Sequence, residues 1–181
     1  NDNEINASLH KRDSATISYL EKRTYHLKTF NDSGWTDKTI PYTDNYEKVF
    51  WFRRSFPATI SNLKGKYVKL VLHGANYITD VWVNGNYVGW HEGGYTSFFF
   101  DVSSYLNYDG NDNIAIRVHT IPWTNRQDVY QDVVPYASLD FRNYGGIYRN
   151  IYLEATDNLN IVRADVKPSL KLDANGKVVT N

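Results

Sequence analysis

Apolar side chains alternate with a period of two along several segments of this chain, and this alternation constrains the fold more than any other feature. In residues 67–73 the side chains of Val68, Leu70 and Leu72 fall on one side of an extended backbone, which is the pattern of a strand with one buried face. The same period recurs in residues 114–118. Long helical periodicity is scarce, and aromatic residues make up 15% of the chain, a composition typical of pleated surfaces. We therefore expect an all-β domain.

Between residues 46 and 56 both alternating sets carry large side chains. One set is Val49, Trp51 and Arg53, and the other is Phe50, Phe52, Arg54 and Phe56. This pattern favours a strand inside a β-sandwich with both of its faces covered. Further strands are expected at 96–100 and 147–154. A short periodic stretch lies at 17–20, and a long irregular stretch spans 120–141.

The dipeptide Asn84-Gly85 predicts the sharpest turn in the chain. Both residues tolerate positive φ, and they separate strand-like runs at 80–83 and 86–90. These features favour a two-residue type I′ hairpin. A second hairpin turn is expected at 174–176, where the sequence is Ala-Asn-Gly.

Charge and composition exclude several classes of function. Twenty basic and twenty acidic residues cancel without forming long blocks, so no nucleic acid or membrane partner is expected. The chain has no cysteine, which excludes a disulfide framework, a thiolate zinc site and a thiol nucleophile. At 181 residues it fits one domain.

Two segments resemble metal-binding motifs only in part. His91 and Glu92 begin like HExxH, but Tyr95 stands where the second histidine is required, and two glycines oppose the helix. The run at 109–113 begins like a calcium loop, but Ile114 occupies the position that needs glycine. No metal and no cofactor are expected.

Three segments together resemble one known family. They are LHGANYITDVWVNG at 72–85, HEGGYTSFFFDVS at 91–103 and DFRNYGGIYRNIYLE at 140–154. In this order they resemble the N-terminal sugar-binding domain of glycoside hydrolase family 2, the β-galactosidase and β-glucuronidase family. The resemblance implies a jelly-roll β-sandwich of the galactose-binding-domain-like type at 46–157. An arm at 1–45 would pack on it, and 158–181 would be a linker or the first strands of an immunoglobulin-like domain.

The resemblance also implies that the catalytic residues lie elsewhere. The acid/base signature of the family, Asn-Glu-Pro, is absent from this chain, as is the βα alternation of a catalytic barrel. Two carboxyl groups on a rigid scaffold are needed for glycoside hydrolysis. We therefore expect this chain alone to be inactive and its parent to be a retaining glycosidase, often a homo-oligomer in this family.

What the chain is expected to supply is part of a sugar pocket. Asn76 and Asp140 match an asparagine and an aspartate that reach the bound sugar in the family, and Asn143 and Tyr144 would edge the same pocket. A carboxylate accepts two hydroxyl hydrogen bonds, and a carboxamide both donates and accepts. The alternatives are a loop carboxylate capping backbone amides at Asp140, a turn side chain bonding its own backbone at Asn76, and simple packing at Asn143 and Tyr144.

The expected partners are a β-glycoside sugar and the catalytic barrel of the same parent chain. The LHGAN segment is similar to β-galactosidases, whereas DFRNYGGIYR is nearest the β-glucuronidase type, and we favour a galactosidase. Two alternatives stay open. One is a free-standing lectin-type module that stacks sugars on aromatics such as Trp90, Trp123 or Tyr136. The other is a structural or dimerising domain.

Overall fold

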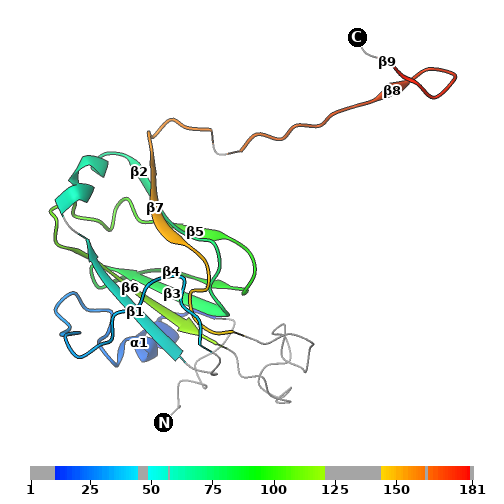
Figure 1. Ribbon diagram of the computed structural model, residues 1–181. Helices are drawn as coiled ribbons and strands as arrows, with labels where there is room; N and C mark the ends of the chain where they lie inside the picture. The colour runs from blue at the N-terminus through cyan, green and yellow to red at the C-terminus, as the bar shows by residue number, and fades with distance from the viewer. Residues whose placement is uncertain (1–10, 45–48, 57, 121–143, 162, 180–181) are drawn as a thin grey trace, which may run out of the picture.

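Two antiparallel sheets face each other in the computed structural model, which describes residues 11–44, 49–56, 58–120, 144–161 and 163–179 (Figure 1). The four-stranded sheet has the order β1 (Val49–Phe56), β6 (Asp112–His119), β3 (Ile78–Val83) and β4 (Asn86–Glu92). The three-stranded sheet has the order β5 (Phe98–Asp101), β2 (Tyr67–Leu72) and β7 (Ile151–Thr156). The expected all-β sandwich is confirmed.

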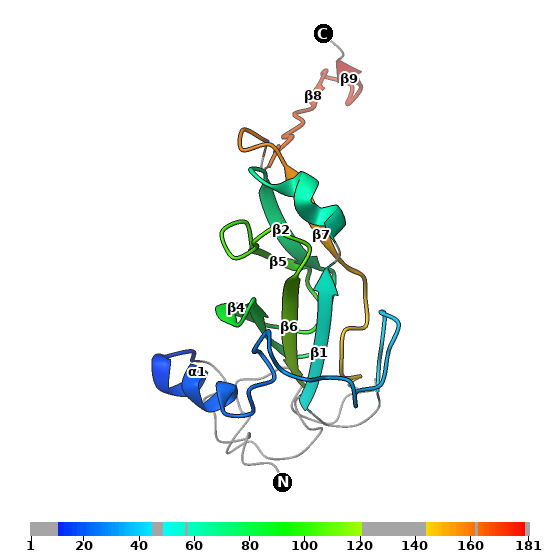
Figure 2. The same cartoon turned by 90° about the vertical axis from the view of Figure 1, so that its left-hand side faces the viewer.

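Four further elements complete the described part of the chain. They are the helix α1 (Ser14–Glu21), the 3-10 helix η2 (Ala58–Leu63) and the two short strands β8 (Lys171–Leu172) and β9 (Val178–Val179). Neither helix is long and apolar enough to cross a membrane. After Thr156 the chain leaves the sandwich and runs extended to the β8-β9 hairpin (Figure 1, Figure 2).

The main core lies between the two sheets. Val68, Leu70 and Leu72 of β2 are at most 2% exposed, while the residues between them in β2 are half-buried. Residues 114–118 of β6 contribute the facing set. The period-two prediction is confirmed for both strands because each turns every second side chain into this core.

The hairpin prediction at Asn84-Gly85 is also confirmed. Asn84 has a φ of 52° and Gly85 a φ of 84°, the left-handed pair that a type I′ turn requires. The turn at 174–176 joins β8 to β9, with Gly176 at a φ of 78°. Strand β7 differs from the expectation, because it begins at Ile151 and not at Ile147.

The outer face of the four-stranded sheet is covered by the N-terminal segment. Leu20 of α1 packs with Trp82 and Ala115 in a second buried cluster, and Trp51 stacks on Trp82 with ring centroids 5.1 Å apart. Phe50, on the opposite side of β1, packs against the main core. Side chains on both faces of β1 are therefore partly buried, as its two large side-chain sets predict, although Arg54 and Ser55 are exposed.

A buried ion cluster joins this N-terminal segment to the sheet. The Asp80 side chain is fully buried and accepts hydrogen bonds from Arg12, from Arg117 at 3.1 Å and from the Tyr87 hydroxyl at 3.1 Å. The Arg12 guanidinium also lies over the Trp90 ring, 4.7 Å from its centroid. Burial, and then the nearby Asp80 charge, raise the pKa of the Tyr87 phenol above its ordinary value. The phenol therefore stays neutral and donates a hydrogen bond to Asp80.

Replacing Asp80 with Asn should destabilise the fold by about 3–5 kcal/mol, because the two buried guanidinium groups lose their shared counter-charge. Urea unfolding of the chain measures this. The matched control is Asp157→Asn, since Asp157 is exposed and pairs with Lys66 at 3.0 Å; it should cost less than about 1 kcal/mol. If the two variants unfold at the same urea concentration, the ion cluster does not stabilise the packing of the N-terminal segment on the sheet.

Candidate functional site

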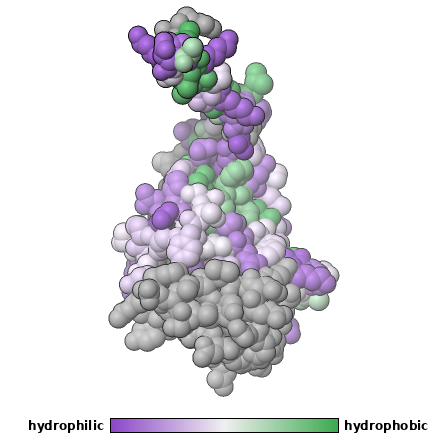
Figure 3. Space-filling model, turned by 90° about the vertical axis from the view of Figure 1, so that its right-hand side faces the viewer, coloured by the Kyte–Doolittle hydropathy of each residue, from purple (hydrophilic) through white to green (hydrophobic). Residues whose placement is uncertain are grey.

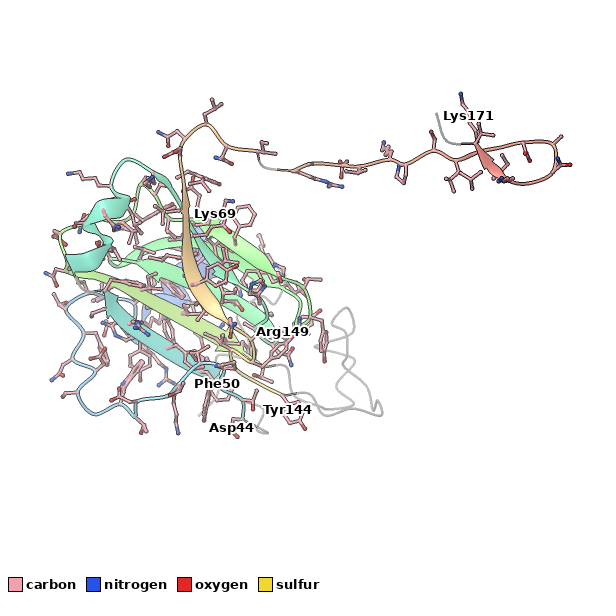
Figure 4. The ribbon with its side chains drawn as sticks, turned by 45° about the horizontal axis from the view of Figure 1, so that its top comes forward. Asp44, Phe50, Lys69, Tyr144, Arg149 and Lys171 are labelled. Atoms are coloured by element: carbon pink, nitrogen blue, oxygen red, sulfur yellow. The ribbon has the colours of Figure 1, made fainter. Side chains whose placement is uncertain are left out.

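Three segments meet at one end of the sandwich, around residues 73–77, 93–97 and 144–150. The His73 amide donates to the Asn150 carbonyl at 3.0 Å, and the Gly93 amide donates to the Tyr77 carbonyl at 3.1 Å. Figure 4 labels Tyr144 and Arg149 at this end, with Asp44 close to Tyr144. We call these three segments the sandwich end.

Asn76 lies inside the sandwich end and not on its surface. It is 2% exposed, and its carboxamide nitrogen donates to the Tyr144 carbonyl at 2.7 Å. The backbone carbonyl of Asn76 accepts a hydrogen bond from the Thr120 hydroxyl at 3.0 Å. The carboxamide nitrogen thus bonds a carbonyl far along the chain and not its own turn, and it fixes the backbone at Tyr144.

Gly145 and Gly146 pass through a space too narrow for any side chain. A Cβ atom on Gly145 would lie 2.2 Å from the Thr120 hydroxyl oxygen, and one on Gly146 would lie 2.7 Å from the Tyr42 carbonyl oxygen. The backbone of Gly145 exchanges two hydrogen bonds with Asp44, at 3.0 and 3.1 Å. The backbones therefore approach closely here, and Gly146 has a φ of 100°, which favours glycine.

Tyrosines lie around the surface of the sandwich end. Tyr144 is 45% exposed and Tyr95 is 50% exposed. The Tyr148 hydroxyl donates to the Gly94 carbonyl, and the Arg149 guanidinium lies over the Tyr148 ring at 5.3 Å. Sequence reasoning proposed Tyr144 and missed Tyr95, although the two glycines before Tyr95 are a turn signal that places its ring at the surface.

The structure places two of the four predicted site residues and brings them together, since Asn76 bonds the backbone of Tyr144. Asp140 and Asn143 lie outside the described residues. Their roles stay predictions, as does direct sugar contact by Asn76. Tyr144 follows Asn143 directly, so the bond from Asn76 fixes the chain at the C-terminal end of the 140–144 segment.

Two histidines, one buried and one half-buried, lie close to the sandwich end. His119 is 5% exposed, and its carbonyl accepts from the Tyr77 amide at 3.1 Å. Burial, followed by repulsion from Arg117 and Arg12, lowers the pKa of His119 to about 3. His91 stacks on Phe98 at 3.9 Å, and burial lowers its pKa also. Both imidazoles are therefore neutral at pH 7 and offer hydrogen bonding without charge.

A separate cleft of about 1010 Å³ opens between the edges of β1 and β7, under residues 32–42. Its aromatic lining includes Trp35, Tyr42, Phe50 and Phe52. Within the described ranges no three His, Cys, Asp or Glu side chains are grouped to hold a metal ion.

Known proteins similar to this chain are glycosidases. The family model for "Glycosyl hydrolases family 2, sugar binding domain" matches residues 14–157. A β-galactosidase of Thermoanaerobacter pseudethanolicus is 35% identical over 131 residues, which cover 69% of this chain and 17% of that protein. A β-glucuronidase of Bacteroides fragilis is 33% identical over 121 residues, which cover 67% of this chain and 15% of that protein.

Solved structures agree with these relatives. A β-glucuronidase of Bacteroides uniformis superposes with a TM-score of 0.63 at 30% identity, covering 83% of this chain and 17% of that one. The chain therefore spans less than a fifth of the length of the relatives that it matches.

Gly146→Ala should destabilise the chain by about 2 kcal/mol or more, because the new methyl group meets the Tyr42 carbonyl and the backbone keeps a positive φ. Thermal or urea unfolding measures the loss. Gly34→Ala is the control, since a Cβ there meets nothing within 4 Å. If both variants unfold at the same midpoint, the crowding at Gly146 is not what shapes this end.

The free energy of unfolding should fall as the pH drops below about 6.5. His119 binds a proton in the unfolded chain but not in the folded one until about pH 3, so the unfolded state gains stability by up to about 1.4 kcal/mol per pH unit. Urea titrations between about pH 7 and about pH 4.5 measure the slope. His119→Gln should flatten it, and parallel curves for the two proteins would contradict the assignment.

Proposed function

This chain belongs to the sugar-binding domains of glycosyl hydrolase family 2, and from that premise we propose that it completes the sugar site of a larger retaining β-glycosidase. The family match over 144 consecutive positions, 14–157, supports this. The observation that carries it is the bond from Asn76 to the Tyr144 carbonyl. It ties two family motifs, far apart in the sequence, to one end of the sandwich.

In this proposal Asp140 holds the sugar and Asn76 holds the segment that carries Asp140. Two hydroxyl groups donate to the carboxylate, and these charge-assisted bonds strengthen as the oxocarbenium-like transition state forms. Asn143 and Tyr144 edge the same pocket, and the exposed Tyr144 ring offers an apolar face to the sugar. The acid/base and nucleophile carboxylates come from outside this chain.

We favour a β-galactosidase as the parent over a β-glucuronidase. The relatives include both activities at similar identity, so the preference rests on LHGAN at 72–76. Half-buried His91 and buried His119 are neutral, which suits a neutral sugar better than a uronate carboxylate.

The partner in this proposal is the catalytic barrel of the same parent chain, in a homo-oligomeric enzyme. Residues 158–181 lead towards it as a linker or as the first strands of an immunoglobulin-like domain. Leu159, Ile161 and Val166 are 87–95% exposed, and apolar side chains gathered on one extended segment are typical of a surface that packs against another body. In the lectin-type alternative the Trp90 ring is less available for stacking on a sugar, since Arg12 lies over it.

In the parent enzyme, Asp140→Ala should lower kcat/KM strongly while leaving the melting temperature nearly unchanged, because in this proposal the Asp140 carboxylate serves the sugar pocket and not the fold. A loss of less than about threefold, equivalent to about 0.7 kcal/mol, would refute the pocket role. Asp157→Ala is the control and should keep full activity, since Asp157 is an exposed residue at the opposite end of β7 from Tyr144. Asn76→Ala should lower both activity and stability, because its buried bond positions the backbone.

A further inference from the structure

The outer face of the three-stranded sheet is open to solvent, unlike the covered outer face of the four-stranded sheet. Phe99 of β5 is 52% exposed and Tyr152 of β7 is 41% exposed. Figure 3 shows apolar residues gathered on this side of the molecule, between the grey residues and the C-terminal tail. Figure 4 looks onto the same sheet from above, with Lys69 labelled on it. We call this surface the open face.

Side chains on the open face form ordered rows across the strands. Val71 of β2 pairs with Phe99 on one side and with Tyr152 on the other, so these three form an apolar row. The next row is Asp101, Lys69 and Glu154. Such rows follow from the register, because paired residues point to the same side of a sheet.

Polar groups on both sides of the apolar row are held in place. The Lys69 ammonium donates to the Glu154 carboxylate at 2.9 Å and lies 5.1 Å from the centre of the Phe99 ring. On the other side, the His73 ring bonds the Ser97 hydroxyl and the Tyr152 hydroxyl, each at 3.0 Å. These contacts fix the two aromatic rings before any ligand arrives, which lowers the entropy cost of binding.

This combination suits a sugar chain. A pyranose ring has an apolar face of C–H groups and an edge of hydroxyls, so it needs an aromatic surface beside groups that both donate and accept. Phe99 and Tyr152 lie two strands apart, about 10 Å, which is the reach of two linked pyranose rings. The carboxylates of Asp101 and Glu154 would meet the hydroxyls, while the His73 ring holds the Tyr152 hydroxyl in place.

The charges on the open face argue against other ligands. One lysine stands between two carboxylates, so the face has no positive excess to attract nucleic acid or an anionic sugar. Lysine and glutamate are depleted from the centres of protein interfaces, yet Lys69 and Glu154 lie beside the apolar row. A protein partner is therefore the weaker fit.

We propose that the open face binds a neutral oligosaccharide across Phe99, Val71 and Tyr152. This site adjoins the sandwich end, which supplies His73 and Ser97 beside Tyr152, but it does not depend on the function proposed above. Its role would be to hold one part of an oligosaccharide while another part of that oligosaccharide, or a second oligosaccharide, is processed.

Isothermal titration of this 181-residue chain with β-1,4-linked galactotetraose, cellotetraose and xylotetraose tests the proposal. At least one of these probes should bind with millimolar or tighter affinity. Phe99→Ala and Tyr152→Ala should each weaken that binding about tenfold or more. Both rings are exposed, so melting temperatures should show that the variants are folded. Tyr152→Phe, which keeps the ring and loses the bond to His73, should give an intermediate loss.

Leu27→Ala is the control. Leu27 is an exposed apolar residue of the N-terminal segment, so binding should stay within about twofold. Tyr144→Ala tests the competing site at the sandwich end. Loss of binding in Tyr144→Ala, but not in Phe99→Ala, would assign the sugar to the sandwich end and overturn the open-face site while leaving the proposed function intact. No binding of any probe would overturn it as well. Protection of the open face in the sugar-free parent enzyme, measured by hydroxyl-radical footprinting of Tyr152, would assign the face to a neighbouring domain.

Discussion

The structure depends most on the close approach of backbones at Gly145 and Gly146. Here the chain runs between Asp44 on one side and Asn76 on the other, bonded to both by main-chain hydrogen bonds. Because no Cβ fits at either glycine, the three segments meet at a spacing that side chains cannot alter. The sandwich end takes its shape from this contact. The exposed Tyr144 lies directly beside it, on a backbone that hydrogen bonds and close packing hold in place.

Local patterns predict the sheets of this protein well. Alternation identified β2 and β6, and the Asn84-Gly85 dipeptide identified the hairpin, because each depends on residues adjacent in sequence. What local patterns could not give are contacts made across long separations. Arg12 reaches Asp80 from 68 residues away, and nothing near Arg12 in the sequence indicates that the N-terminal segment covers a sheet.

In the candidate site, too, the sequence indicates which residues matter, whereas their contacts depend on how distant segments pack. Tyr144 was expected at the edge of a sugar pocket, and it is exposed. Asn76 lies buried with its nitrogen on the Tyr144 carbonyl, and its contact with a sugar stays a prediction. A motif match can indicate that a side chain matters, but burial is set by how separate segments pack. Asp140 and Asn143 lie outside the described residues, so their place in the pocket rests on the family resemblance.

The exposed tail has a consequence for how this chain behaves in solution. Beyond Thr156 the described chain carries Leu159, Ile161 and Val166 almost fully in water, and it ends in a two-stranded ribbon with exposed valines at 178 and 179. A ribbon of this kind offers unpaired strand edges, which are templates for association between copies. Concentrated samples of this chain should therefore aggregate more readily than the sandwich alone. Truncation after Asp157 would remove the exposed tail and leave both sheets of the sandwich intact.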